Sequence, residues 1–257
     1  MIKMLLTDLD HTLLKQDGSI SEETLQTISK CRANGIRFAI ATARYWIGAE
    51  RYIDILKPDY EITTDGTLIH AGGECIYSCV FDKETTDLIV RCILESVPGA
   101  EITVAVGKCV YWNSKHISES EKLYKAVYND YSACLDVEAN KIVAELPDEG
   151  IAGNIADRTG SRLQSYRSEN WYAFLPKESG KINAIKALSR MSGISLESIA
   201  AFGDDSNDID MLKLCGKGIA VSNAVPEVLK IADEITSSND EDGVARWINS
   251  NMIGLCH

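Results

Sequence analysis

Two aspartates near the amino terminus, Asp8 and Asp10, carry the strongest chemical signal in the sequence. They follow the short apolar run Ile2–Leu6, which is typical of a buried strand. In an extended chain the side chains of residues i and i+2 point the same way, so both carboxylates would face one site. Two carboxylates at such a short distance repel each other, and a divalent metal ion is the simplest way to offset that repulsion. The pair would supply a nucleophile and a neighbouring acid or base, although solvated aspartates after an edge strand would give the same pattern.

Three other segments supply the groups that such a site would need. The run Ile199–Asp208 is again a short apolar strand, and it ends in the acids Asp204, Asp205 and Asp208. Another predicted strand ends at the hydroxyl of Thr42 and is followed by Arg44, and Lys181 lies near the start of a predicted helix. The carboxyl ends of parallel strands converge on one crevice of an open α/β sheet. Together with the amide of Asn207, these acids, the hydroxyl and the lysine indicate a metal-assisted phosphoryl site.

In their order and spacing, these motifs resemble those of the haloacid dehalogenase superfamily, specifically the Cof-type phosphatases of subfamily IIB. The resemblance runs from end to end and rests on Asp8-Leu-Asp-His-Thr (D-x-D-x-T), Thr42-Ala-Arg44 (T/S-G-R), Lys181, Gly203–Asp208 (G-D-x-x-N-D), and the closing segments Ala220–Ala224 and Thr236–Ala245. Four positions depart from the family pattern, namely His11, Ala43, Asp65 and Ser222. None of the departures removes a chemical group from the core motifs, but His11 and Asp65 could alter the choice of substrate.

The resemblance implies a role for each candidate residue. Asp8 would attack the phosphorus and form an aspartyl-phosphate, while Asp10 would protonate the leaving oxygen and then deprotonate water. Mg²⁺ would be bound by Asp8, by the backbone carbonyl of Asp10 and by Asp204. The phosphoryl oxygens would be held by Thr42, Ala43, Lys181 and Asn207. Asp208 would fix the lysine or a metal-bound water, and the candidate substrate contacts are His11, Arg44 and Asp65.

The pattern of elements predicts an α/β fold with an inserted domain. Short apolar strands alternate with helices over residues 1–82 and 177–257, which predicts a discontinuous core with a doubly wound parallel sheet. A capping box at Ser19–Glu22 would open a helix that runs to Ala33. Residues 83–176 change pattern and predict an antiparallel sheet with helices on one face, including a helix at Ser118–Tyr128. This segment resembles the family's C2B cap, which would determine substrate specificity.

Composition narrows the range of partners. The formal net charge of −12 argues against a nucleic-acid partner, which would require a basic face. No apolar run approaches membrane-spanning length and no signal-peptide pattern is present, so we expect a cytoplasmic protein. The eight cysteines lie mostly in apolar stretches, which predicts buried free thiols. His70, Cys75 and Cys79 have no standard zinc-site spacing.

Two other functions are compatible with parts of this pattern. A phosphomutase or phosphotransferase of the same fold would pass the phosphoryl group to a second hydroxyl instead of to water. A receiver-type signalling module also places aspartates, a threonine and a lysine around Mg²⁺, but it would not need Asp10 as an acid/base or a large inserted domain. We therefore expect a Mg²⁺-dependent phosphatase that acts on a small phosphorylated metabolite, with sugar phosphates as the leading substrate class.

Overall fold

The computed structural model describes residues 1–114, 124–166 and 170–252. The described residues form two compact units. The first contains Met1–Ala43, Arg51–Ile76 and the chain from Gly180 onward, and the second contains Arg44–Glu50 and Tyr77–Ser179. None of the helices in the described part of the chain combines the length and the apolar character needed to span a bilayer.

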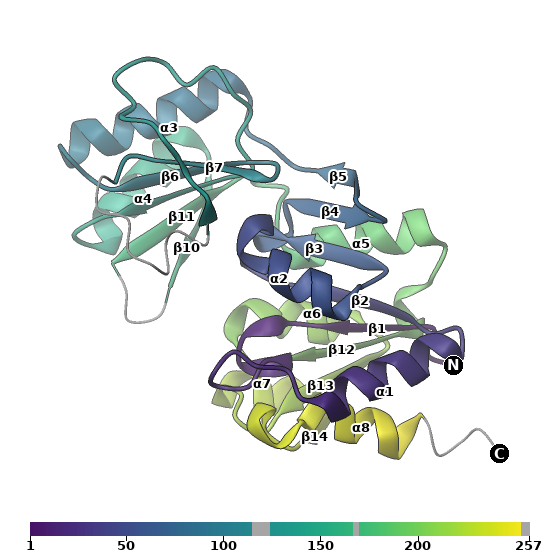
Figure 1. Cartoon of the computed structure of the whole chain (residues 1–257). Coiled ribbons are helices and arrows are strands. Elements are labelled where there is room, and N and C mark those ends of the chain that lie inside the picture. Colours follow the sequence, from purple (N-terminus) through teal and green to yellow (C-terminus); the bar gives the residue numbers. More distant parts are fainter. Residues whose placement is uncertain (115–123, 167–169, 253–257) are drawn as a thin grey trace. The chain divides into compact units, whose positions relative to one another are not determined.

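The first unit is built on an eight-stranded sheet in the order β14-β13-β12-β1-β2-β3-β4-β5 (Figure 1). All neighbouring pairs from β14 to β3 are parallel, and β4 runs antiparallel to β3. The predicted parallel sheet is therefore confirmed. In chain order the strands are β1 (Met4–Thr7), β2 (Arg37–Ala41), β3 (Tyr60–Thr63), β4 (Leu68–Ala71), β5 (Glu74–Ser78), β12 (Ile199–Gly203), β13 (Lys217–Val221) and β14 (Glu234–Thr236).

The central strand β1 is apolar because both faces of the sheet are covered at this point. Leu5, Leu6 and the neighbouring Phe38 of β2 are almost completely buried, and burial on both faces is typical of parallel strands. On its other side β1 pairs with β12, where Thr7 lies opposite Phe202. The two acid-bearing loops therefore leave the sheet side by side.

Helices cover both faces of this sheet. They are α1 (Glu22–Ala33), α2 (Trp46–Leu56), α5 (Lys181–Ser192), α6 (Ile209–Leu214), α7 (Pro226–Ile231) and α8 (Gly243–Asn251). From β1 the chain crosses toward β3, and from β12 it crosses the opposite way toward β14. Because such crossovers are right-handed, α1 and α2 cover one face and α6 and α7 cover the other. α8 packs with α1, and α5 packs with α6.

The first helix begins at a different cap from the predicted one. Ser21 is the N-cap of α1, and its hydroxyl accepts a hydrogen bond from the backbone N–H of Thr24 at 3.0 Å. The prediction of a capping box that begins at Ser19 is wrong, because the backbone N–H of Ser19 donates to Asp17 in the preceding turn. A capping box that begins at Ser21 would need a glutamate or glutamine at the third helical position, which Thr24 occupies.

The last helix, α8, was not anticipated from the sequence. It spans nine residues and begins after Asp242, which has a left-handed backbone and caps no N–H with its side chain. The sequence does carry a start signal here, since aspartate is a usual N-cap residue and apolar residues follow at helical spacing. Its buried face includes Trp247, whose ring meets Phe202 of β12 edge-on at a centroid distance of 5.3 Å.

The second unit contains a six-stranded sheet in the order β10-β11-β9-β6-β7-β8. Its strands are β6 (Ile102–Val106), β7 (Cys109–Trp112), β8 (Val127–Tyr128), β9 (Lys141–Glu145), β10 (Arg162–Ser165) and β11 (Trp171–Leu175), and its helices are α3 (Lys83–Ser96) and α4 (Glu149–Thr159). Neighbouring strands are antiparallel except at one edge, where β8 is parallel to β7. A helix does not extend to Tyr128 as predicted, since Val127 and Tyr128 form β8; residues 118–123 of that prediction lie outside the described residues.

One face of this second sheet is covered by α3 and α4, which pack together over a shared core. Ile89, Ile93 and Phe174 are fully buried in that core. The insertion is thus an α+β unit with helices on one face, as the sequence predicts.

The cysteines in the described residues are free thiols, but not all are buried. Cys31, Cys92 and Cys215 are buried, as predicted. Cys75 and Cys134 are exposed, so the prediction is wrong for these two; Cys75 lies on β5, whose side chains are mostly exposed.

Candidate active site

The end of β1 delivers Asp8 to a buried position. The strand ends at Thr7, and the backbone N–H of Asp8 continues the pairing by donating to the carbonyl of Phe202 at 3.0 Å. Only 6% of Asp8 is exposed. The chain then enters the short π-helical turn η1 (Leu9–Leu13), so that Asp10 lies in the first turn and is half-buried.

Lys181 connects this strand end with the loop after β12. Its ammonium Nζ lies 2.6 Å from Oδ1 of Asp8 and 2.6 Å from Oδ1 of Asp208. The lysine is 5% exposed and stands at the first position of α5, where the helix dipole disfavours a cation. Burial lowers the pKa of Lys181, but the two carboxylates outweigh that effect and raise it above its ordinary value. The lysine is therefore protonated at neutral pH.

Asp208 is fully buried and uses both carboxylate oxygens within the protein. Oδ1 accepts from Lys181, while Oδ2 accepts from the backbone N–H groups of Asp204 and Asp205 at 3.1 and 3.2 Å. These bonds close the loop that leads from β12 into the 3-10 turn η5 (Ser206–Asp208). Asp208 therefore holds both the lysine and the loop that carries Asp204.

Asp204 is held by a hydrogen bond from Thr12. The Thr12 hydroxyl donates to Oδ1 of Asp204 at 2.7 Å, and this bond joins η1 to the loop after β12. Burial raises the pKa of Asp204 to about 6, and repulsion from Asp208 adds to that effect. The hydrogen bond from Thr12 acts in the other direction, because it stabilises the ionised carboxylate.

Replacing Thr12 with valine is expected to lower the free energy of unfolding of the metal-free protein at pH 7 by about 1.5–3 kcal/mol, because a buried carboxylate would lose a charge-assisted hydrogen bond. Urea denaturation measures this change. Thr12→Ser is the matched control, since it keeps the hydroxyl and should retain most of the stability. Equal stability of Thr12→Val and the parent protein would show that the bond contributes nothing.

Three of the acids lie close enough together to bind one cation. Asp8, Asp204 and Asp208 are all buried and offer carboxylate oxygens within 4.8 Å of one another. Three carboxylates and one ammonium leave a formal charge of −2, which matches a divalent ion. Burial raises the pKa of Asp8 well above its usual range, with repulsion from Asp208 and Asp204 adding to the effect, so ionisation of the cluster calls for a cation.

The second predicted motif reaches the same edge of the sheet at the end of β2. Thr42 is buried, and its backbone N–H donates to the carbonyl of Ile62 at 2.9 Å. Its own carbonyl accepts from the N–H of Asp65 at 3.3 Å. Ala43 is half-buried and is the last residue of this stretch in the first unit. Arg44 belongs to the second unit, where its guanidinium donates to the carbonyl of Gly48 at 3.4 Å.

The other candidate residues differ in exposure. Asn207 is exposed on η5 and His11 is exposed on η1, where His11 adopts a left-handed backbone with φ of 57°. Asp65 is 3% exposed and also left-handed.

Asparagines near the end of the chain also shape this site, although we assigned them no role from the sequence. The side-chain amide of Asn223 donates to the carbonyl of His11 at 2.8 Å, and its oxygen accepts from the N–H of Asn239. Asn239 in turn donates to the carbonyl of Leu14 at 2.8 Å. These bonds hold the middle of η1 and the residue that follows its end. Both residues lie in the two closing segments that resemble the family, and this resemblance was the sequence signal that could have identified them.

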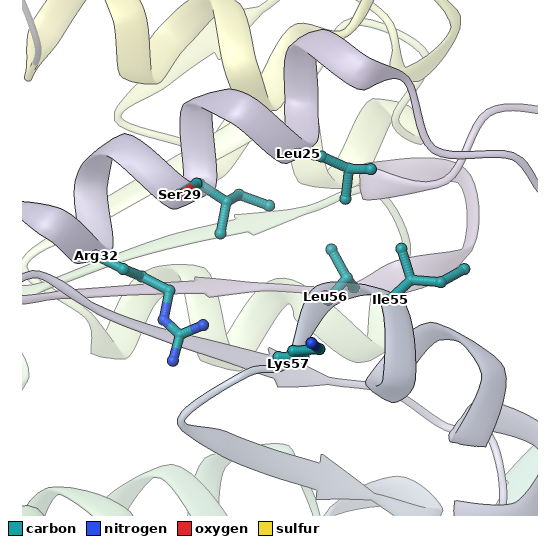
Figure 2. A pocket seen from close by; sticks show the side chains of 7 residues that line it. Leu25, Ser29, Arg32, Ile55, Leu56 and Lys57 are labelled. Atoms are coloured by element: carbon teal, nitrogen blue, oxygen red, sulfur yellow. The ribbon is translucent and has the colours of Figure 1, made fainter.

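A surface cavity of about 240 Å³ lies away from this chemistry, between α1 and the end of α2 (Figure 2). Leu25, Ile28 and Leu56 line it, with Arg32 and Lys57 beside them. It contains none of the candidate site residues, so it does not bear on the reaction.

Comparison with known proteins assigns the family. A family model described as haloacid dehalogenase-like hydrolase matches residues 5–248. The chain is 26% identical to 5-amino-6-(5-phospho-D-ribitylamino)uracil phosphatase YitU of Bacillus subtilis, over 95% of this chain and 96% of that protein. A crystal structure of a haloacid dehalogenase-like hydrolase from Bacteroides thetaiotaomicron matches with a TM-score of 0.83 and 25% identity, covering 97% of this chain and 99% of that one. The subclass IIB sugar phosphatase BT4131 shares the fold, with a TM-score of 0.81 and 21% identity over 96% of this chain and 98% of that one.

The chain belongs to the haloacid dehalogenase-like hydrolases. Within that superfamily it is a phosphatase, and it shares its fold with a subclass IIB sugar phosphatase. The resemblance found in the sequence motifs is therefore confirmed.

Proposed function

We propose that the protein is a Mg²⁺-dependent phosphatase that hydrolyses small phosphomonoesters, with sugar phosphates as the leading class, through an aspartyl-phosphate on Asp8. One observation carries the proposal, namely the buried ion pair in which Lys181 lies 2.6 Å from Asp8 and from Asp208. A buried carboxylate held beside a protonated lysine is a competent nucleophile toward a phosphate ester, because the lysine offsets the repulsion between the two anions.

The donor set fits magnesium. Mg²⁺ prefers hard oxygen ligands and is usually held by one or two carboxylates together with waters and substrate oxygens. Asp8, Asp204 and the backbone carbonyl of Asp10 would hold it. Asp208 is the poorer ligand of the clustered acids, since both its oxygens already accept hydrogen bonds from Lys181 and the loop. When bound, the ion would neutralise charge on the phosphoryl oxygens.

The protein's own groups would carry out two displacements at phosphorus. In the first, a carboxylate oxygen of Asp8 forms a bond to phosphorus, the ester P–O bond breaks, and Asp10 gives its proton to the leaving oxygen. In the second, Asp10 takes a proton from water as the water oxygen attacks the phosphorus and Asp8 is released. Thr42, Ala43, Lys181 and Asn207 would hold the phosphoryl oxygens through both steps.

The substrate would be a small, polar phosphomonoester. The relative YitU is named for a substrate with a phosphorylated ribityl chain, and this supports a polyol-like or sugar-like leaving group here as well. Residues 83–176, the proposed cap, would supply specificity, because the core motifs recognise only phosphate and metal. His11, Arg44 and Asp65 are the remaining candidate contacts.

A turnover screen tests this function. Phosphate release would be measured over a panel of sugar, polyol, nucleotide and aryl phosphates, each with Mg²⁺ and with a chelator. We expect chelator-sensitive release, with at least one sugar or polyol phosphate among the best substrates. No release from any ester, or release that a chelator leaves unchanged, would contradict the proposal.

Binding of Mg²⁺ is expected to weaken as the pH falls below about 6. The pKa of Asp204 is raised to about 6, so protons compete with the metal for its oxygens. With that pKa roughly one Asp204 in ten is ionised at pH 5, so protonation of Asp204 alone should lower the affinity about tenfold between pH 7 and pH 5. Protonation of Asp8, whose pKa is also raised, should add to this fall.

Calorimetric titration of Mg²⁺ at several pH values measures this dependence. Because the pKa of Asp204 is raised in the fold, the metal-free protein loses stability as the pH rises through 6. Mg²⁺ binds the ionised carboxylate, so it should increase the melting temperature more at pH 7 than at pH 5. Asp204→Asn is the control, and its residual binding should depend less on pH. A constant affinity between pH 5 and 7 would contradict the assignment of Asp204 as a ligand.

A further inference from the structure

A buried turn beside the active site has an unfavourable backbone. Thr64, Asp65 and Gly66 follow β3, and their φ angles of 54°, 55° and 79° place all three in the left-handed region. We call these residues the left-handed turn. Glycine adopts this conformation freely and Asp tolerates it, but a β-branched threonine rarely does. The sequence therefore maintains a costly conformation at this point.

The left-handed turn is tightly closed and completely buried. The carbonyl of Thr64 accepts from the backbone N–H of Thr67 at 3.2 Å and from its hydroxyl at 2.8 Å. The hydroxyls of Thr63 and Thr64 are buried and have no hydrogen-bond partner among the described residues, which adds a second cost. Strain of this kind persists where the surroundings hold it in place, and it is common at functional sites.

One end of the left-handed turn is bonded to the segment that carries Thr42. The N–H of Asp65 donates to the Thr42 carbonyl at 3.3 Å, and the N–H of Thr42 donates to Ile62 just before the turn. The position of Thr42, and hence of its hydroxyl, is therefore fixed from both sides by β3 and the turn that follows it.

The other end of the left-handed turn packs on the peptide that carries Lys181. A Cβ at Gly66 would lie 2.4 Å from the backbone carbon of Gly180 and 2.6 Å from the backbone nitrogen of Lys181. Gly66 is thus in direct contact with the start of α5. The side chain of Lys181 then reaches Asp8 and Asp208. A single three-residue turn touches both segments that would hold the phosphoryl oxygens.

We propose that the left-handed turn is a positioning element for the phosphate site, and that it sets the spacing between the Thr42 hydroxyl and the Lys181 ammonium. Asp65 acts in this inference through its backbone, because it must remain left-handed while its N–H reaches Thr42. The inference rests on the proposed function, since it concerns the two groups that would hold phosphate. A small displacement of such groups weakens electrostatic stabilisation steeply.

Substitutions at Asp65 test the requirement for a left-handed backbone. Asp65→Val opposes the conformation because valine is β-branched, whereas Asp65→Asn and Asp65→Gly permit it. Binding of orthovanadate, an analogue of phosphate, would be measured by calorimetry in the presence of Mg²⁺, together with kcat and KM for an aryl phosphate. We expect Asp65→Val to lose at least tenfold in orthovanadate affinity and in kcat. Asp65→Asn and Asp65→Gly should each recover most of that loss.

A matched control separates positioning from loss of stability. Lys57 also has a left-handed backbone, with φ of 47°, but it is exposed beside the cavity at the end of α2 (Figure 2). Lys57→Val should lower the melting temperature and leave orthovanadate binding unchanged. If Asp65→Val does not fold, Asp65→Ala imposes a smaller penalty and should give the same ranking.

Two results would overturn the inference. The first is a folded Asp65→Val or Asp65→Ala protein that binds orthovanadate as tightly as the parent. The second is an Asp65→Gly protein that loses as much affinity as Asp65→Val, because the side chain and not the backbone would then be responsible. Failure of the proposed function is distinguishable, since it would appear as a parent protein that releases no phosphate from any ester.

Discussion

Replacement of Asp8 by asparagine is expected to abolish turnover, with a loss of at least ~10⁴-fold in kcat, while the protein remains folded. Asparagine has nearly the same shape, but its amide cannot form the covalent ester with phosphorus. It also removes the negative charge that Lys181 faces at 2.6 Å. Steady-state release of phosphate from an aryl ester measures the loss, and circular dichroism checks the fold.

The matched control for this variant is Asp210→Asn. Asp210 is an exposed acid in the first turn of α6, two residues beyond Asp208, and it has no role in the proposed chemistry. This variant should retain activity within about twofold, as is usual for surface substitutions away from special features. An Asp8→Asn enzyme with activity near that of Asp210→Asn would remove Asp8 from the mechanism.

Replacement of Asp10 by asparagine is expected to reduce kcat by about 10²–10⁴-fold for alkyl phosphates, the usual contribution of general acid–base catalysis. The backbone carbonyl that would bind Mg²⁺ is retained, so metal binding should survive. The loss should be smaller for aryl phosphates, whose leaving oxygens need little protonation.

Parallel assays on an alkyl and an aryl phosphate test this role, with Mg²⁺ affinity measured on the same variant. Equal losses for both esters would count against Asp10 as the acid. A large drop in Mg²⁺ affinity would indicate instead that the carboxylate, and not the backbone carbonyl, binds the metal.

Much of the core could be predicted because its local patterns agree with its tertiary environment. The sequence pattern predicts a helix at about Trp46–Leu56 and a strand at Tyr60–Thr63, and the structure has α2 and β3 at these bounds. Both have an apolar periodicity that matches one face or one buried strand, and Pro58 separates them. Alternation of such elements was sufficient to predict a parallel sheet.

The two missed elements differ in their local signals. β8 is a two-residue edge strand and is too short to show a pattern. α8 follows Asp242 and has apolar residues at helical spacing, so its signal was present although no helix was predicted there. The cap of α1 was placed two residues early because Ser19 and Ser21 are both good capping residues, and only the bond to Thr24 distinguishes them.

The chemistry of the site could be predicted further than its geometry. The residue types at Asp8, Asp204 and Lys181 indicated a metal-assisted phosphoryl site, since few other arrangements need them together. The bond from Thr12 to Asp204 joins residues 192 positions apart, so no local pattern reveals it. The same holds for the contact between Gly66 and the start of α5, which depends on how β3 and α5 pack.

The most direct test of the proposed mechanism is a rapid acid quench of the enzyme with a ³²P-labelled phosphate ester and Mg²⁺. The mechanism predicts label on the protein that survives acid, is released by hydroxylamine, and maps to the peptide that contains Asp8. It also predicts more bound label in Asp10→Asn with an aryl ester, because release from Asp8 then lacks its base. Free labelled phosphate that forms at the full rate of turnover, with no label on the protein in either enzyme, would contradict the aspartyl-phosphate.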